Sequence, residues 1–208
     1  REFEPLSAVR DSRTRATLKI QDGCVNFCSY CIIPYARGPL RSRPLPDIST
    51  EVELLSREGY QEIVLTGIHL ASYGRDLAEE GVTLLDAIAR ASAPAGIRRI
   101  RLGSLEPLFV TEPVAKALAE NPKICRQFHL SLQSGSNTVL KRMNRKYTAE
   151  EYLHALALLR QYMPDCAITT DVIADFAGET EAEHLETLAF CQQAAFARMH
   201  VFPFSLRK

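Results

Sequence analysis

Cys24, Cys28 and Cys31 lie within eight residues near the start of the chain. Thiolates are ligands of zinc and of iron–sulfur clusters, and this spacing places all three on one short segment. A closed zinc site or a ferredoxin cluster takes four protein ligands, yet the next cysteine is Cys125 and the nearest histidine is His69. The group is therefore one ligand short, which suits a site where a substrate binds directly at the metal.

The other cysteines are Cys125, Cys166 and Cys191, and no pair of them has metal-ligand spacing. We expect these three to behave as small buried hydrophobic residues. A tight cysteine group of this kind is typical of a metal or redox site in a reducing compartment, not of a disulfide framework. A zinc knuckle that takes His69 or another distant residue as its fourth ligand is the alternative interpretation.

The overall composition sets broad limits on the class of protein. The chain has 208 residues, of which 46% are hydrophobic and 24% charged, as expected for one globular α/β domain. Basic and acidic residues number 25 each, so the total charge indicates no nucleic-acid partner, although local patches can. No apolar run is long enough to cross a membrane and no signal peptide is evident, so we expect a cytoplasmic protein without a membrane partner.

Apolar segments rich in β-forming residues alternate with helical patterns along the chain. Strands are predicted at residues 18–21, 62–66, 99–103, 128–132, 167–174 and 197–204. Helices are predicted at residues 49–58, 83–91, 112–119, 149–161 and 181–194. Ser49 or Thr50, Thr111 and Thr148 are candidate N-caps of three of these helices. Six strands joined by crossover helices predict parallel pairing.

Polar or glycine-rich residues follow nearly every predicted strand. They lie at residues 22–24, 66–69, 103–106, 133–135 and 175–179. Chemistry at the C-terminal ends of many strands is typical of β/α barrels, whereas an open sheet with one switch point concentrates it at fewer positions. We therefore predict an α/β fold, an incomplete TIM-like (β/α)6 barrel, over residues 17–208, with a linker segment at residues 1–16.

The CxxxCxxC pattern, with aromatic Tyr30 before its last cysteine and a strand before the loop, resembles the radical S-adenosylmethionine superfamily. The resemblance implies that Cys24, Cys28 and Cys31 bind three irons of a [4Fe–4S] cluster. S-adenosylmethionine would chelate the fourth iron, and an electron from a donor such as flavodoxin or ferredoxin would cleave it to a 5′-deoxyadenosyl radical. Tyr30 would then lie near the adenine.

Longer segments resemble the methylthiotransferase branch of this superfamily. They cover residues 28–44, 101–107, 129–136 and 140–147. The branch adds a methylthio group to a modified adenosine of tRNA or to a ribosomal-protein aspartate. Residues 64–76 are most similar to the members that act on threonylcarbamoyladenosine in tRNA, while isopentenyladenosine and the ribosomal-protein aspartate are the alternative substrates.

The resemblance also assigns contacts with S-adenosylmethionine to residues at successive strand ends. These are Tyr30, Thr66, Gly67, Ser104, Glu106, Ser131, Gln133 and Asp171. Each one alone is more often a turn or cap residue, and their recurrence at strand ends supports the assignment. The segment that begins at Asp171 departs from the family motif at Asp175, where glycine is usual, and at Ala177, where proline is usual. A carboxylate there can hinder a close approach of the backbone.

Two basic groups lie beside these motifs. They are Arg37, Arg41 and Arg43, and Arg142, Arg145 and Lys146. Each group either contacts tRNA phosphates or another domain, or is simply a solvated loop. Members of the branch also have an N-terminal domain with three more cysteines and a C-terminal RNA-binding domain, which this sequence lacks. We expect an excised central domain that generates the radical but does not complete methylthiolation alone; a non-catalytic metal module that binds RNA or protein is the alternative function.

Overall fold

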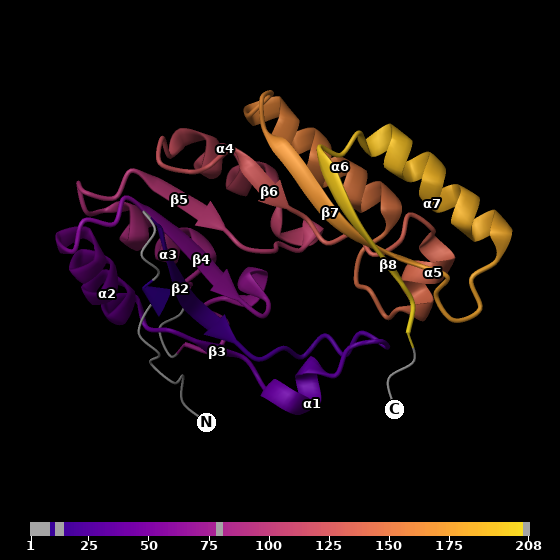
Figure 1. Cartoon of the computed structure of the whole chain (residues 1–208), viewed down its shortest axis with the longest axis horizontal. Helices are drawn as coiled ribbons and strands as arrows, with labels where there is room; N and C mark the ends of the chain where they lie inside the picture. The colour runs from indigo at the N-terminus through magenta and orange to yellow at the C-terminus, as the bar shows by residue number, and fades with distance from the viewer. Residues whose placement is uncertain (1–8, 11–14, 78–80, 206–208) are drawn as a thin grey trace.

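Six strands that run parallel form the framework of the chain (Figure 1). The computed structural model describes residues 9–10, 15–77 and 81–205. The six strands are β2 (Arg15–Asp22), β4 (Glu62–Gly67), β5 (Arg99–Leu102), β6 (Gln127–His129), β7 (Ala167–Ala174) and β8 (Arg198–Pro203). Two short strands, β1 (Val9–Arg10) and β3 (Arg41–Ser42), pair with β2 in the antiparallel direction.

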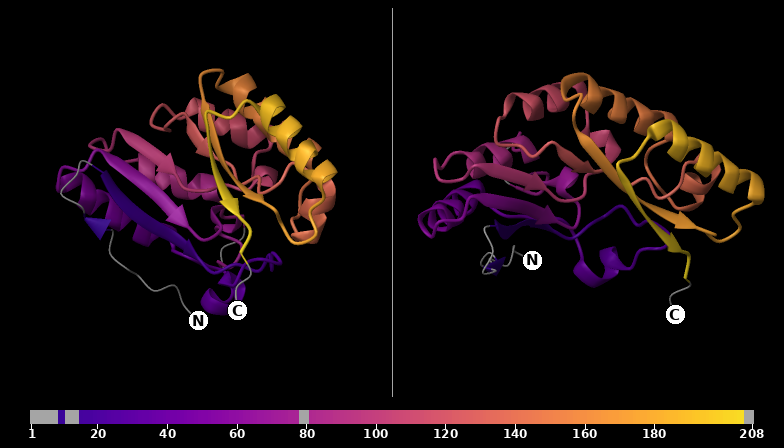
Figure 2. Two further views of the ribbon diagram at one scale, coloured as in Figure 1. Left: turned by 45° about the vertical axis from the view of Figure 1, so that its right-hand side comes forward. Right: turned by 45° about the horizontal axis from the view of Figure 1, so that its top comes forward.

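Helices connect the strands and lie outside the arc that the strands form (Figures 1 and 2). The longer ones are α2 (Leu45–Arg57), α3 (Leu84–Ser92), α4 (Glu112–Glu120), α6 (Ala149–Tyr162) and α7 (Glu181–Ala194). Shorter turns are α1 (Ile33–Arg37), η1 (Leu70–Ser72), η2 (Pro107–Phe109) and α5 (Asn137–Arg142). None of the helices in the described ranges is long and apolar enough to span a membrane.

The strands form two parallel sheets that meet at a narrow seam. β2, β4 and β5 belong to one sheet, and β6, β7 and β8 belong to the other. Between β5 and β6 the described chain has two isolated bridges, Ile100 with Ile124 and Leu105 with Leu130. The result is a curled sheet that ends at β8 and leaves the barrel open, which confirms the predicted incomplete (β/α)6 barrel.

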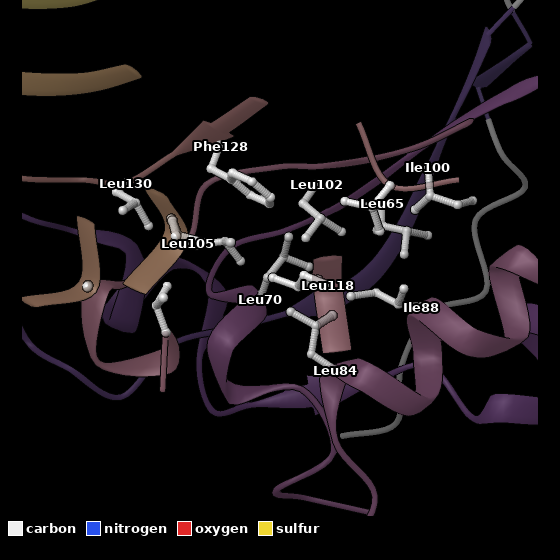
Figure 3. Packing of buried hydrophobic residues seen from close by; sticks show 14 of the residues in the cluster. Leu65, Leu70, Leu84, Ile88, Ile100, Leu102, Leu105, Leu118, Phe128 and Leu130 are labelled. Carbon is white, nitrogen blue, oxygen red and sulfur yellow. The ribbon is translucent and has the colours of Figure 1, made fainter. Parts of the chain in front are cut away.

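Alternate residues of β2, β4, β5, β6 and β7 build the core between the sheet and the helices. Figure 3 shows Leu65, Ile100 and Leu102 of the strands near Leu84 and Ile88 of α3. All five are buried. Because side chains alternate along a strand, the residues between these apolar positions point to the other, helix-free face. That concave face therefore carries a different set of side chains from the core.

The structure corrects several predicted boundaries. Helix α2 begins at Leu45, so Ser49 and Thr50 lie inside it, where their hydroxyls donate to the carbonyls of Leu45 and Pro46. Prolines fit the first turn of a helix because the missing N–H would be unpaired there anyway. Thr148 does cap α6, with a reciprocal bond to Glu151, whereas the side chain of Thr111 makes no cap hydrogen bond at the start of α4.

The predicted fourth strand is also shorter than expected. Its ladder with β7 ends at His129, and beyond it single bridges form at Leu130 and Gln133. Gln133 has a left-handed φ of 70°, which breaks the regular pairing there. The sequence did not predict α1 and α5, because helices of five and six residues are too short to show a periodic apolar pattern.

Candidate functional site

The three cysteines lie on the loop between β2 and α1, at the C-terminal end of the first barrel strand. This segment, residues 23–32, is called the cysteine loop below. Gly23 starts it with a left-handed φ of 73°, and a Cβ added there would collide with the carbonyl oxygen of Pro39. The amide of Cys24 donates to the carbonyl of Gly38 at 3.1 Å. The loop is therefore held tightly against the segment that follows α1.

A distant turn fastens the other half of the cysteine loop. The amide of Ser29 donates to the carbonyl of Met143 at 3.1 Å. The side-chain amide of Asn144 donates to the carbonyl of Phe27 at 2.8 Å and to that of Asn26 at 3.2 Å. The loop thus takes its shape from the turn after α5.

Gly23→Ala should lower the free energy of unfolding by about 3 kcal/mol, because it adds a steric clash to an unfavourable φ. Gly178→Ala is the matched control, since Gly178 has a φ of 74° and open space around its Cα. That change should cost only about 1 kcal/mol. Urea unfolding of both variants measures the difference, and equal losses would mean that the contact with Pro39 does not matter.

The cysteine side chains are partly buried and form no disulfide. Burial raises the pKa of Cys24, and the nearby thiols of Cys28 and Cys31 add to this effect. In the part of the chain that the structure describes, no three ligating side chains converge to hold one metal ion. A [4Fe–4S] cluster binds each thiolate through a different iron, so its ligands need not meet at one point. Three neighbouring thiols on one loop fit the donor set of such a cluster.

A cluster of buried polar side chains lies beside the cysteine loop and comes from the loops after two strands and one helix. His69 follows β4, Glu106 follows β5 and Arg145 follows α5. His69 Nε2 lies 3.0 Å from Glu106 Oε2, and Arg145 Nη2 lies 3.7 Å from Glu106 Oε1. The side chains of Arg145 and Glu106 are only 10% and 12% exposed. Asn26 of the loop also donates to Glu106, at 3.4 Å.

Arg145 connects this polar group to a cysteine. Its Nη1 donates to Cys28 Sγ at 3.4 Å, its Nε donates to the Tyr147 hydroxyl at 3.1 Å, and the guanidinium lies 4.8 Å from the centre of the Tyr147 ring. Burial disfavours the charged form, but the neighbouring Tyr147, Tyr30 and Cys28 outweigh it and keep the pKa of Arg145 above its usual value. The cation is therefore fixed beside Cys28.

Glu106 provides the opposite charge at the same place. Burial alone would raise the pKa of Glu106, but the hydrogen bond from His69 and the charges of His69 and Arg145 hold it below the usual value. The site thus presents a buried carboxylate and a buried guanidinium next to the cysteine loop. Such a pair suits a ligand that carries both an amino group and a carboxylate.

A cavity of about 380 Å³ adjoins the cysteine loop at Tyr30. Three of the predicted site residues, Tyr30, Gln133 and Asp171, line it together with Ile173 and residues 202–205. Burial raises the pKa of the Tyr30 hydroxyl. The amide of Gln133 donates to the carbonyl of Asp171 at 2.8 Å, which joins the segment after β6 to β7. Aromatic walls and polar side chains from separate strands are typical of a small-ligand pocket.

The remaining predicted residues occupy different positions. Thr66, Gly67 and Ser131 are half-buried at strand ends, Ser104 is exposed, and none of them lines the 380 Å³ cavity. A Cβ on Gly67 would crowd Gln21, which is fully buried. Gly67 thus allows β2 and β4 to approach closely.

Sequence reasoning missed Gln21, His69 as a partner of Glu106, and the true position of Arg145. Gln21 donates to the carbonyls of Asp22 and Gly23 and accepts from the amide of His69 at 2.6 Å. Gln21 therefore joins the start of the cysteine loop to the start of the loop after β4. The only available signal was that His69 and Arg145 lie within segments that resemble the methylthiotransferase branch.

Several charges of the two basic groups have partners within the fold. Arg145 is buried at Cys28, and Arg142 pairs with Glu183 at 2.8 Å. Arg43 is buried and pairs with Glu51, while Arg41 pairs with Asp22 and donates to loop carbonyls. Most of these charges are therefore used within the fold.

Asp175, which replaces the usual glycine of the motif, adopts a left-handed φ of 58°. Aspartate tolerates this conformation better than most residues. Its side chain is exposed, and the next amide, that of Phe176, donates to Glu179 Oε2 at 2.9 Å. The turn thus keeps the backbone shape expected of glycine at this position.

Comparisons with known proteins identify the family of the chain. Residues 18–191 match the family model described as the Radical SAM superfamily. The threonylcarbamoyladenosine tRNA methylthiotransferase MtaB of Bacillus subtilis is 47% identical over 196 residues, which cover 94% of this chain and 43% of that protein. The tRNA-2-methylthio-N(6)-dimethylallyladenosine synthase of Syntrophomonas wolfei is 44% identical and covers 98% of this chain and 46% of that protein. The chain thus spans less than half the length of these curated relatives.

Solved structures with low sequence identity share the fold. The radical S-adenosylmethionine methyltransferase TsrM from Kitasatospora setae matches 90% of this chain and 35% of its own, with a TM-score of 0.71 and 19% identity. Methylornithine synthase matches 92% of this chain and 53% of its own, with a TM-score of 0.61 and 11% identity.

Proposed function

The chain belongs to the radical SAM superfamily, and we propose that it holds a [4Fe–4S] cluster through Cys24, Cys28 and Cys31 and cleaves S-adenosylmethionine reductively. When bound, the cluster supplies the electron that breaks a carbon–sulfur bond of S-adenosylmethionine. One observation carries the proposal: a buried carboxylate and a buried guanidinium lie together beside the cysteine loop. Opposite charges at this place match the two charged groups of an amino acid.

We propose that Glu106 and Arg145 orient the methionine end of S-adenosylmethionine. Its amino group would lie at Glu106 and its carboxylate at Arg145. Both side chains are already held in place, Glu106 by His69 and Arg145 by Tyr147, so little reorganisation is needed on binding. The low exposure of the pair strengthens both interactions because water screens them weakly.

The 380 Å³ cavity would receive the adenosine end. Its volume lies within the range of small-ligand pockets, about 300–1,000 Å³. Tyr30 and Phe204 offer aromatic surface to the base, and the carboxylate of Asp171 can accept from ribose hydroxyls. Tyr30 lies between two of the proposed cluster ligands, so the two halves of this ligand site adjoin.

We further propose that the chain is the radical-generating part of a cytoplasmic methylthiotransferase that acts on threonylcarbamoyladenosine in tRNA. The relatives that act on the two modified adenosines are 47% and 44% identical to the chain, so identity alone does not separate them. The resemblance of residues 64–76, which contain His69, favours the threonylcarbamoyl substrate. In this proposal, sulfur delivery and RNA binding need further parts of a longer protein, and a flavodoxin or ferredoxin supplies the electron.

Anaerobic reconstitution with iron and sulfide, followed by reduction and addition of S-adenosylmethionine, tests the central step. We expect 5′-deoxyadenosine, measured by liquid chromatography and mass spectrometry, in proportion to the bound cluster. A protein whose cluster is intact by electron paramagnetic resonance but which yields no 5′-deoxyadenosine would be a non-catalytic metal module instead.

A further inference from the structure

Polar side chains cover the concave face of the half-barrel next to the 380 Å³ cavity. Inward positions of a closed β/α barrel are usually filled by bulky apolar residues. Here the residues opposite the core on β5, β6 and β7 include Arg101, Gln127, His129, Thr169 and Asp171, all partly exposed. A face that is open and polar is suited to bind a polar ligand, not to pack a core.

A chain of hydrogen bonds fixes this face across the seam between the two sheets. Glu62 Oε1 accepts from Arg101 Nε at 3.1 Å, and Arg101 Nη1 donates to Gln127 Oε1 at 2.9 Å. Gln127 Nε2 donates to Thr169 Oγ1 at 3.2 Å, and His129 Nδ1 lies 3.1 Å from the same oxygen. These bonded side chains of the concave face, called the polar wall below, are held in place by one another without a ligand.

The edge strand β8 adds two side chains to the wall. Its register with β7 sets Arg198 beside Thr169 and His200 beside Asp171, so these side chains share the concave face. His200 Nδ1 lies 3.5 Å from Asp171 Oδ1, and the His200 side chain is 52% exposed. Arg198 is exposed and forms no ion pair with any residue in the described ranges. Arg198 therefore keeps its charge and all its donors for a ligand.

The charges on this face are unbalanced in favour of cations. Arg99 and Arg101 share the single carboxylate of Glu62. Asp171 lies between two imidazoles, with His129 Nε2 at 3.2 Å from its second oxygen. Arg198 has no counter-charge among the described side chains. The surface thus attracts an anion.

We infer that Arg198 and His200 bind a carboxylate on the modified side chain of the substrate nucleoside; this inference rests on the proposed function. A threonylcarbamoyl group ends in an amino-acid carboxylate and a hydroxyl, whereas a dimethylallyl group is a hydrocarbon. The planar fork of arginine matches a carboxylate. A hydrocarbon on this wall would cover its polar groups without offering them hydrogen-bond partners. Asp171 joins this wall to the adenosine cavity, so the nucleoside side chain and the proposed ligand would be neighbours.

Binding of anticodon stem-loop RNA by the complete gene product tests the inference. The RNAs share one sequence and carry threonylcarbamoyladenosine, its uncharged carboxamide analogue, or dimethylallyladenosine. We expect Arg198→Gln to weaken binding of the carboxylate RNA about tenfold and to leave binding of the carboxamide RNA unchanged. His200→Gln should act in the same direction. Both side chains are exposed, so neither substitution removes a core contact.

Val201→Thr is the matched control, since Val201 directly follows His200, lies on the opposite face of β8 and is 60% exposed. It should bind all three RNAs as the wild type does. An equal loss for the carboxylate and carboxamide RNAs in Arg198→Gln would identify a phosphate contact and overturn the inference, as would no loss at all. Cleavage of S-adenosylmethionine by the wild type is assayed separately, so failure of the proposed function would show there and not in RNA binding.

Discussion

Cys28→Ala should reduce the iron content of the reconstituted chain from about four atoms to near zero. Two thiolates from the same loop would remain, and Arg145 would lose the sulfur to which it donates at 3.4 Å. The fold should persist, because Cys28 lies on a loop outside the hydrophobic core and its neighbour Ser29 stays bonded to Met143. Iron and sulfide analysis together with thermal unfolding would measure both effects.

Cys166→Ala is the matched control for that experiment. Cys166 is also a free, partly buried cysteine, but it packs against the core far along the chain, next to β7. It should keep the full iron content. Full iron in Cys28→Ala, or loss of iron in Cys166→Ala, would contradict the assignment of the cluster ligands.

Arg145→Gln should weaken the binding of S-adenosylmethionine to the reconstituted chain by about 10- to 100-fold. The guanidinium is the only partner of Glu106 with a permanent positive charge among the contacts described above, and it is the proposed partner of the ligand carboxylate. Arg145→Lys should recover only part of the affinity. Lysine keeps the positive charge, but its compact ammonium lacks the planar set of donors with which the guanidinium reaches Cys28, Glu106 and Tyr147 together. Equilibrium dialysis with labelled S-adenosylmethionine measures the loss.

Arg142→Gln provides the control for a general loss of positive charge. Arg142 lies three residues away and pairs with Glu183 at the surface of the described structure. Binding of S-adenosylmethionine should be unaffected by this change. If the two variants lost affinity equally, the effect would come from the overall charge of this region and not from the buried pair.

The sequence predicted the framework of the fold because its signals are local. Apolar segments rich in β-forming residues marked β2, β4 and β7, and the cysteine spacing marked the loop that follows the first of them. Tyr30, Gln133 and Asp171 were predicted one strand end at a time, and the parallel topology brought them to one cavity. Parallel strands place their C-terminal ends at the same edge, so this grouping follows from the fold class.

The parts that sequence reasoning missed depend on contacts between distant segments. Arg145 lies in a basic run with Arg142 and Lys146, and nothing local distinguishes the buried residue from its exposed neighbours. Its burial arises because the turn after α5 packs on the cysteine loop. His69 likewise gains its role only when the loops after β4 and β5 meet at Glu106.

Asn144 fastens the cysteine loop from 117 and 118 residues further along the chain. During synthesis the three cysteines therefore emerge well before the side chain that shapes their loop. Contacts at such separation form late in folding, because the intervening chain must be ordered first. We therefore expect the thiols to stay in an unformed loop until α5 and the turn after it are in place. We expect a cluster to be inserted after folding, into a loop that the second half of the barrel has completed.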